Sequence, residues 1–109
     1  MATTQIVDNF KNTIVDTVQT AFTSTLYPVV IEAFTAANNA TVNASYKAYI
    51  VSASGVEQPL RPFKVVVWSE NDLGIGIVNQ VIPVGGTLRL ESSALDSIYF
   101  TVTGREIIT

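Results

Sequence analysis

Strict alternation of apolar and polar residues near the C-terminal end sets the strongest limit on the fold. In the segment 87–91, TLRLE, two leucines alternate with polar residues, and the segment 97–103, SIYFTVT, repeats the pattern. Successive side chains of a strand point to opposite faces, and a one-residue slip would exchange the faces. The alternation therefore predicts two strands whose inward side chains are Leu88, Leu90, Ile98, Phe100 and Val102.

The same period of two begins at Thr41 and continues through most of the chain. VNASYKAYIVSA alternates from Val42, whereas FKVVVWSE is apolar on both faces and predicts a central strand. The pair Gly85 and Gly86 predicts a tight corner in which at least one glycine has a positive φ. Short strands separated by turns in this way indicate an antiparallel β domain over 41–109, either a sandwich or a partly open barrel.

The N-terminal part favours a different structure. Apolar residues recur every four positions, which predicts a helix over 3–26, and Pro28 is placed to open a second short helix. The predicted fold class is therefore α+β, with an N-terminal helical segment at 1–40 followed by the β domain at 41–109. The apolar arc of this helix is wider than one core requires, so we expect a partner to contact Ile6, Phe10, Ile14, Val18 and Phe22.

Charge is scarce and scattered. Charged residues make up 14% of the 109 residues, against about 25% in an ordinary soluble domain. Lys and Glu are depleted at interface cores, so a chain this poor in charge is suited to covering its surface with partners; a small neutral domain with a threonine-rich surface is the other interpretation. The net charge of −3 and the absence of a basic cluster argue against a nucleic-acid partner.

Neither a signal peptide nor a membrane span is predicted. The start, MATTQIVDNF, lacks a basic n-region and reaches Asp8 early. The long weakly charged stretch at 12–31 contains Asp16, Pro28 and many threonines, which makes it too polar for a transmembrane helix. We therefore expect no membrane partner.

The residue types that usually carry catalysis are missing. The chain has no histidine and no cysteine, which removes the commonest general base, the usual triad base and most zinc ligands. Two carboxylate pairs, Glu70 with Asp72 and Glu91 with Asp96, lie in turn-like segments where such residues bond the local backbone. We expect no catalytic residue, no metal site, no cofactor and no enzymatic activity.

The aromatic residues leave two interpretations open. A sugar-binding module would present several of them on one face beside Asn or Asp. Strands select aromatic residues whatever their function, so we expect core positions for Trp68 and Phe63 and half-buried, rim or interface positions for the tyrosines.

The stretch VIPVGGTLRLESSALDSIYFTVTG, together with the Thr/Asn/Val-rich composition, resembles the C-terminal half of small β-sandwich structural proteins of tailed-phage virions. The resemblance implies a capsid cement or decoration protein, or another accessory subunit of head or tail. Such subunits bind repeated lattice sites, often as trimers, and carry no catalytic residues.

These observations predict a non-enzymatic structural subunit of a virion. We expect it to form a homo-oligomer, with a trimer favoured, and to bind a larger protein assembly such as a capsid lattice. On the outward face of the last two strands, Arg89 and Tyr99 are the candidate partner contacts, since Arg and Tyr are enriched at interface hot spots; stacking of the two side chains on one another is the other interpretation. The alternative function is a small carbohydrate- or ligand-binding β module.

Overall fold

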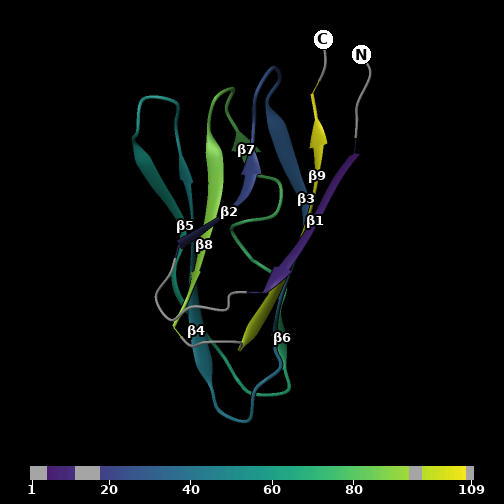
Figure 1. Cartoon of the computed structure of the whole chain (residues 1–109), viewed down its shortest axis with the longest axis vertical. Coiled ribbons are helices and arrows are strands. Elements are labelled where there is room, and N and C mark those ends of the chain that lie inside the picture. The colour runs from purple at the N-terminus through teal and green to yellow at the C-terminus, as the bar shows by residue number, and fades with distance from the viewer. Residues whose placement is uncertain (1–4, 12–17, 94–96, 108–109) are drawn as a thin grey trace.

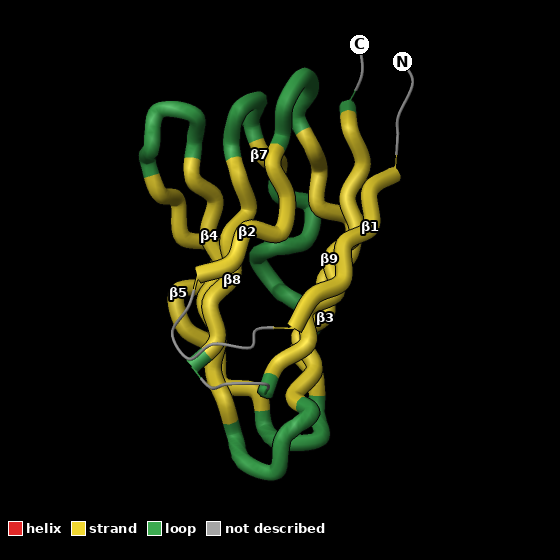
Figure 2. Tube along the Cα trace, viewed as in Figure 1, coloured by secondary structure: helices red, strands yellow, loops and turns green. Residues whose placement is uncertain are grey.

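The computed structural model describes residues 5–11, 18–93 and 97–107, and this part of the chain contains strands and loops but no helix (Figures 1 and 2). Every strand pairing is antiparallel. The strands are β1 Gln5–Lys11, β2 Val18–Thr23, β3 Val29–Asn38, β4 Ala44–Val51, β5 Glu57–Val66, β6 Asn71–Asp72, β7 Val81–Ile82, β8 Thr87–Ser92 and β9 Ile98–Glu106.

The strands form two sheets that face one another. One sheet has the order β1-β9-β3-β6, with β7 also paired to β3, and the other has the order β2-β8-β4-β5. Figure 1 shows the two layers side by side, with loops at both ends of an elongated molecule. A single apolar cluster of the described residues lies between the layers and draws its side chains from β3, β4, β5, β7, β8, β9 and the connection between β6 and β7.

The predicted α+β class is wrong, because the fold is all-β. Within the expected helix over 3–26, residues 5–11 and 18–23 form β1 and β2, which pair with β9 and β8 respectively, and the remaining positions 3–4 and 12–17 lie outside the described residues. A repeat of four residues is also a multiple of the strand period of two, so the apolar spacing suits either structure. The many threonines and valines of this segment favour extended backbone, and the edges of the two sheets offer strands to pair with.

The second short helix expected after Pro28 is also wrong, since β3 occupies residues 29–38. Val29 and Ile31 are buried, and then the ladder to β9 shifts register between Ile31 and Ala33, after which Phe34 and Ala36 are buried. This β-bulge changes the spacing of inward residues from two to three at one point. The buried residues Ile31 and Phe34 are therefore three positions apart, which is also the spacing of apolar residues on one face of a helix.

The strands predicted from strict alternation are confirmed. All five side chains expected in the core are at most 1% exposed, namely Leu88, Leu90, Ile98, Phe100 and Val102. Gly85 has a φ of 80°, as expected for the corner. β8 and β9 belong to different sheets, so the fragment contributes one inner strand to each layer.

The strand predicted to be central lies at an edge. β5 pairs only with β4, through a ladder that is twice irregular. It contains Pro59 and Pro62, which have no N–H group to donate to a further strand. Prolines and bulges are devices that protect a sheet edge from pairing with other chains.

The connection between β6 and β7 closes the open side between β3 and β5. Ile77 from this loop is fully buried in the core, and an added Cβ on Gly76 would lie 3.3 Å from the carbonyl oxygen of Leu60 on β5. The loop is fixed to β3 by the N–H of Ile31, which donates to Gln80, and by that of Asn79, which donates to Ile31.

Gly74 should be far less replaceable than Gly55. Both glycines have a positive φ, 73° and 88°, and an added Cβ at Gly74 would lie 2.5 Å from Cδ1 of Phe34, whereas at Gly55 it would meet nothing within 4 Å. We expect Gly55→Ala to cost about 1–2 kcal/mol of unfolding free energy from backbone strain. Gly74→Ala should cost a further 1–3 kcal/mol or so, because the core must shift.

Urea unfolding of the two variants measures the difference directly. Gly55→Ala is the matched control, since it shares the left-handed backbone and lacks the close contact. Equal losses in the two variants would contradict the packing described for Gly74 against Phe34.

Candidate functional site

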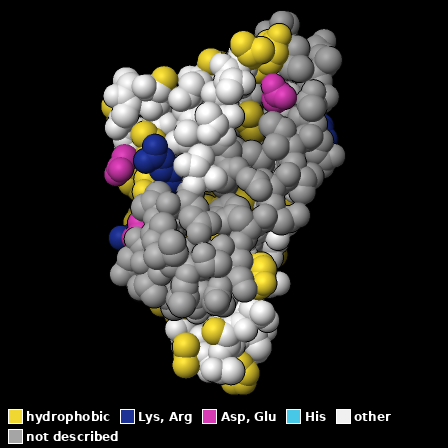
Figure 3. All heavy atoms as spheres, in the orientation of Figure 1, with side chains coloured by type: hydrophobic (Ala, Val, Ile, Leu, Met, Phe, Trp, Pro, Cys, Tyr) yellow, Lys and Arg dark blue, Asp and Glu magenta, His cyan; other side chains and the backbone are white. Residues whose placement is uncertain are grey.

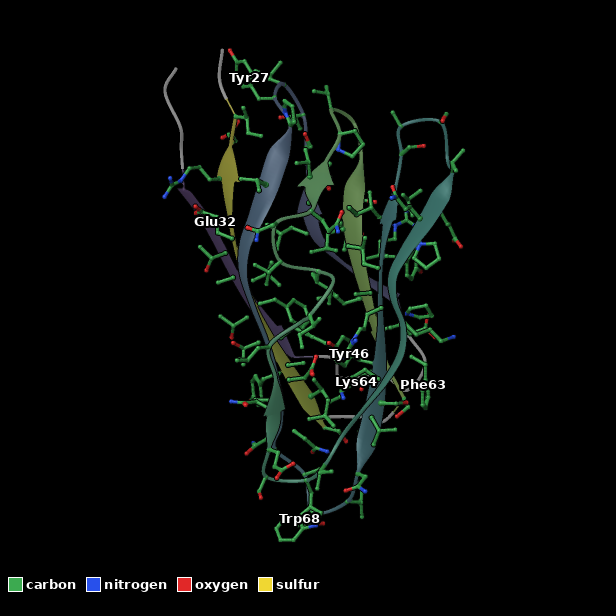
Figure 4. All side chains as sticks on the ribbon, turned by 180° about the vertical axis from the view of Figure 1, so that it is seen from behind. Tyr27, Glu32, Tyr46, Phe63, Lys64 and Trp68 are labelled. Atoms are coloured by element: carbon green, nitrogen blue, oxygen red, sulfur yellow. The ribbon has the colours of Figure 1, made fainter. Side chains whose placement is uncertain are left out.

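The centre of the sandwich is a cluster of three aromatic rings. Tyr46 on β4, labelled in Figure 4, is 1% exposed, and its ring packs against both Phe34 on β3 and Phe100 on β9. The ring centroids are 5.6 Å apart for Phe34 and Tyr46, 5.7 Å for Tyr46 and Phe100, and 6.1 Å for Phe34 and Phe100. These tilted and edge-on arrangements are favourable for aromatic pairs, and they join the two sheets.

The hydroxyl of Tyr46 donates a hydrogen bond to the carboxylate of Asp72 on β6. The same carboxylate accepts the backbone N–H of Gly74 at 3.1 Å, and the guanidinium of Arg61 lies 3.7 Å from it. Burial raises the pKa of the Tyr46 phenol above its ordinary value of 10.0, and the hydrogen bond to Asp72 raises it further. The Tyr46 phenol therefore stays protonated at neutral pH and donates its hydrogen bond to Asp72. Because the Asp72 carboxylate already has Tyr46, Gly74 and Arg61 as partners, the cluster has a structural role.

The other carboxylates singled out in the sequence do not form a second cluster. Glu70 is exposed in the turn before β6, and Glu91 lies 4.0 Å from the ammonium of Lys47. Asp96 lies outside the described residues. No group of three or more potential metal ligands occurs within 5–11, 18–93 and 97–107.

A shallow hollow of about 390 Å³ lies on the outer face of the four-stranded sheet. Its charged lining mixes both signs, with Lys47 and Arg61 against Glu57 and Glu91. Burial raises the pKa of the Tyr49 phenol in this hollow, and the charges of Glu57 and Glu91 add to the effect. Such a hollow has the polar groups to hold a small uncharged or zwitterionic ligand.

The two predicted contact residues are not brought together. Arg89 on β8 lies opposite Tyr49 in the ladder with β4, beside the hollow, and its Nε donates to Thr87 at 3.2 Å. Tyr99 is 41% exposed on β9, in the other sheet. Because the inward residues of both strands meet in one core, Arg89 and Tyr99 point away from each other, and the stacking interpretation is wrong.

The apolar residues predicted as helical contacts are distributed over two sheet edges. Ile6 and Phe10 pair through their backbones with Gly104 and Phe100 of β9. Val18 and Phe22 pair with Glu91 and Leu88 of β8. Ile14 lies outside the described residues.

The sequence reasoning missed an exposed apolar surface, and it expected Trp68 and Phe63 in the core. Phe63 is 64% exposed and Trp68 53% exposed, and Figure 4 shows Phe63 on β5 and Trp68 at the end of the molecule. Within residues 20, 23–93 and 97–107, twelve large hydrophobic side chains are exposed, and seven of them lie within 63–81. These seven are Phe63, Val65, Val67, Trp68, Leu73, Ile75 and Val81.

One signal in the sequence was available for this exposure. Pro59 and Pro62 mark β5 as an edge strand, whose side chains have a neighbouring strand on one side only. Apolar side chains also gather at the narrow end of the molecule in Figure 3, away from the charged groups seen in that view.

Comparison with solved structures shows the fold. A chain of the T13 IBDV viral particle matches with a TM-score of 0.56 at 9% identity, over 98% of this chain and 36% of that one. A chain of infectious bursal disease virus, Gx strain, matches with a TM-score of 0.53 at 11% identity, over 99% and 37%. This chain thus spans about a third of the length of those neighbours.

No protein-family model matches the chain, and no curated protein matches it. Among the described residues there is no helix with the length and apolar character needed to cross a bilayer.

Removing the Tyr46 hydroxyl should change both stability and its pH dependence. At pH 7 we expect Tyr46→Phe to cost about 1–3 kcal/mol, because the Asp72 carboxylate loses a donor in a largely buried place. An unfolded tyrosine ionises near pH 10 while the folded Tyr46 stays protonated, so the wild type loses stability as the pH rises above that value. The contribution of Tyr46 to the free energy of unfolding falls by up to about 1.4 kcal/mol for each pH unit above pH 10. The Tyr46→Phe variant has no phenol at this position and lacks this fall.

Denaturant unfolding between pH 7 and 12 tests this, with Tyr99→Phe as the control for loss of a phenol from an outer face. The control should retain the loss of stability that the buried Tyr46 phenol causes above pH 10. An unchanged slope in Tyr46→Phe would mean that the buried phenol does not resist ionisation.

Proposed function

We propose that the chain is a non-enzymatic structural subunit of a virion that self-associates and binds a larger assembly. The observation that carries this proposal is the fold, which matches a chain of a viral particle over 98% of the present chain with a TM-score of 0.56. The more specific role, a tailed-phage cement or decoration protein or a head–tail accessory subunit, rests on the resemblance of the segment 81–104.

The surface supports assembly. Within residues 63–81 a tryptophan, a phenylalanine and five aliphatic side chains are exposed. Aromatic residues are enriched and charged residues depleted in the centres of protein interfaces. A subunit of a larger particle needs such surfaces, because it is covered on several sides at once.

The chemistry of the described residues also fits a structural role. Nucleophilic and general-base catalysis use side chains that are free to exchange protons with a substrate. In this chain the carboxylate of Asp72 accepts hydrogen bonds from Tyr46 and Gly74 and forms an ion pair with Arg61. Histidine and cysteine are absent from the sequence.

One observation favours a second candidate function, a small carbohydrate- or ligand-binding module. The hollow on the four-stranded sheet holds Tyr49 among Lys47, Glu57, Arg61 and Glu91, and such groups hydrogen-bond sugar hydroxyls. A glycan array distinguishes the two functions. Saturable binding that is lost in Tyr49→Ala, together with absence from particles, would favour the binding module.

The virion role predicts that the chain sediments with particles. An antibody to the purified protein should detect it in the particle fractions of a density gradient, in a fixed ratio to the major shell protein. Apolar contacts are not screened by salt, so the association should survive a wash at about 1 M NaCl, where the Debye length is about 3 Å. Free bovine serum albumin added before the gradient is the control for trapping. Recovery of the chain only from the soluble fractions would contradict the proposal.

A further inference from the structure

Two hollows adjoin one another on the outer face of the four-stranded sheet. One, of about 390 Å³, contains Tyr49, and the other, of about 200 Å³, contains Phe63. Lys47 and Glu91 line both hollows, and they lie opposite one another in the ladder between β4 and β8. We call the two hollows together the groove, and the residues that the argument uses are Ser45, Lys47, Tyr49, Glu57, Arg61, Phe63 and Glu91.

The groove follows β4. The outward residues Ser45, Lys47 and Tyr49 are each two positions apart, so they span about 13 Å along the strand. Ser45 lines the smaller hollow, Tyr49 the larger one and Lys47 both. A ligand that fills the groove is therefore longer than a single six-membered ring.

Irregular pairing of β5 coincides with the larger hollow. The ladder between β4 and β5 shifts register on both sides of Ala48, which pairs with Arg61, and both of these residues line the hollow. A bulge bends its strand and redirects the side chains beside it. Pro59 and Pro62 flank Arg61 and add apolar ring surface to the same hollow.

Arg61 has few hydrogen-bond acceptors where it lies. Its side chain is 23% exposed and its guanidinium is 3.7 Å from the Asp72 carboxylate. Its Nε is the one buried side-chain nitrogen or oxygen in the described part of the chain that has no hydrogen-bond partner there. A buried donor without an acceptor costs free energy. An oxygen-rich ligand in the larger hollow therefore gains more from Arg61 than from a guanidinium that is already fully bonded.

The charges of the groove favour a neutral ligand. Lys47 and Arg61 carry two positive charges, and Glu57 and Glu91 carry two negative ones. Both basic groups also have a carboxylate within 4.0 Å, Glu91 for Lys47 and Asp72 for Arg61, so an anion would compete with partners that are already present. A hydroxyl donates and accepts, so a polyhydroxylated molecule can bond the basic and the acidic groups together.

We propose that the groove binds a neutral oligosaccharide of at least two sugar units. The ring of Tyr49 in the larger hollow and that of Phe63 in the smaller one offer apolar surface to the C–H faces of two sugar rings. Lys47 and Glu91 lie where the hollows meet and bond hydroxyls of both units. The proposal rests on the binding function considered for the larger hollow, and it adds the length and the charge of the ligand. In a virion subunit the same groove would attach the particle to a surface that bears glycans.

Isothermal titration calorimetry of the full chain tests the groove with maltotetraose, cellotetraose and chitotetraose, and with the monosaccharides glucose and N-acetylglucosamine. At least one tetrasaccharide should bind with a dissociation constant of about 1 mM or lower, and at least about tenfold more tightly than its monosaccharide, because the smaller hollow adds contacts. Tetragalacturonic acid, an acidic oligosaccharide of the same length, should bind more weakly than that tetrasaccharide.

Two exposed aromatic residues provide a matched pair of variants. Phe63 is 64% exposed and lines the smaller hollow, whereas Trp68 is 53% exposed and is not among the residues that line either hollow. Phe63→Ala should weaken tetrasaccharide binding at least about fivefold and leave monosaccharide binding unchanged. Trp68→Ala should leave both unchanged, and melting curves should show that both variants fold.

Arg61→Lys tests the larger hollow. It keeps a positive charge beside Asp72 but removes the planar fork of donors. Binding of the tetrasaccharide and of the monosaccharide should weaken by the same factor, at least about fivefold, because both ligands occupy the larger hollow.

Three results overturn the inference. The first is that none of the three tetrasaccharides binds at about 10 mM. The second is that tetragalacturonic acid binds more tightly than every neutral sugar, or that the tetrasaccharide binds no more tightly than its monosaccharide. The third is that Phe63→Ala and Trp68→Ala weaken binding equally.

Sedimentation with particles separates this inference from the proposed function. If the chain sediments with particles and binds none of the sugars, the groove fails and the virion role stands. If it binds a neutral oligosaccharide as expected and is absent from particles, the groove stands and the virion role fails.

Discussion

The contacts of the buried Tyr46 phenol fix the position of one sheet relative to the other. Its ring lies on β4 in the four-stranded sheet and packs against Phe34 and Phe100 from the five-stranded sheet. A hydroxyl in an apolar layer costs free energy unless it is bonded, and here Asp72 accepts its hydrogen bond. Apolar packing alone tolerates small sliding of one sheet over the other, whereas this directional bond is satisfied in one arrangement.

A second buried polar group has the same role nearer the end that carries Trp68. Asn38 is 3% exposed, and its side-chain N–H groups donate to the carbonyls of Val42 and Val66 at 3.0 and 2.9 Å. Its side-chain oxygen accepts the N–H of Ala40 at 2.9 Å. The last residue of β3 is thereby joined to the following loop and to the end of β5 in the opposite sheet. Buried polar groups that are fully satisfied specify one arrangement of a core.

The sequence predicted the strands wherever alternation was strict and failed where the spacing was ambiguous. Leu88, Leu90 and Phe100 were placed correctly because their neighbours are polar and no helical spacing competes. The N-terminal segment was wrongly predicted as helix because a four-residue repeat fits both periods, and because its partner residues on β8 and β9 lie 64 to 100 positions away in the chain. The exposure of Phe63 and Trp68 was missed because composition shows how apolar a strand is but not whether a neighbour covers it. Only Pro59 and Pro62 pointed to an edge.

The core contact and the loop that exposes Ile75 are mechanically linked. The carboxylate that accepts the Tyr46 hydroxyl also accepts the N–H of Gly74, the residue immediately before Ile75. Gly74 in turn lies against the ring of Phe34, which packs on Tyr46. A shift of the two sheets relative to each other would therefore move the loop that presents Ile75. A surface that recognises a partner by shape needs this kind of support, because a side chain on an unsupported loop loses in conformational entropy much of what its burial gains. The interaction that sets the spacing of the sheets thus also sets the position of the loop that exposes Ile75.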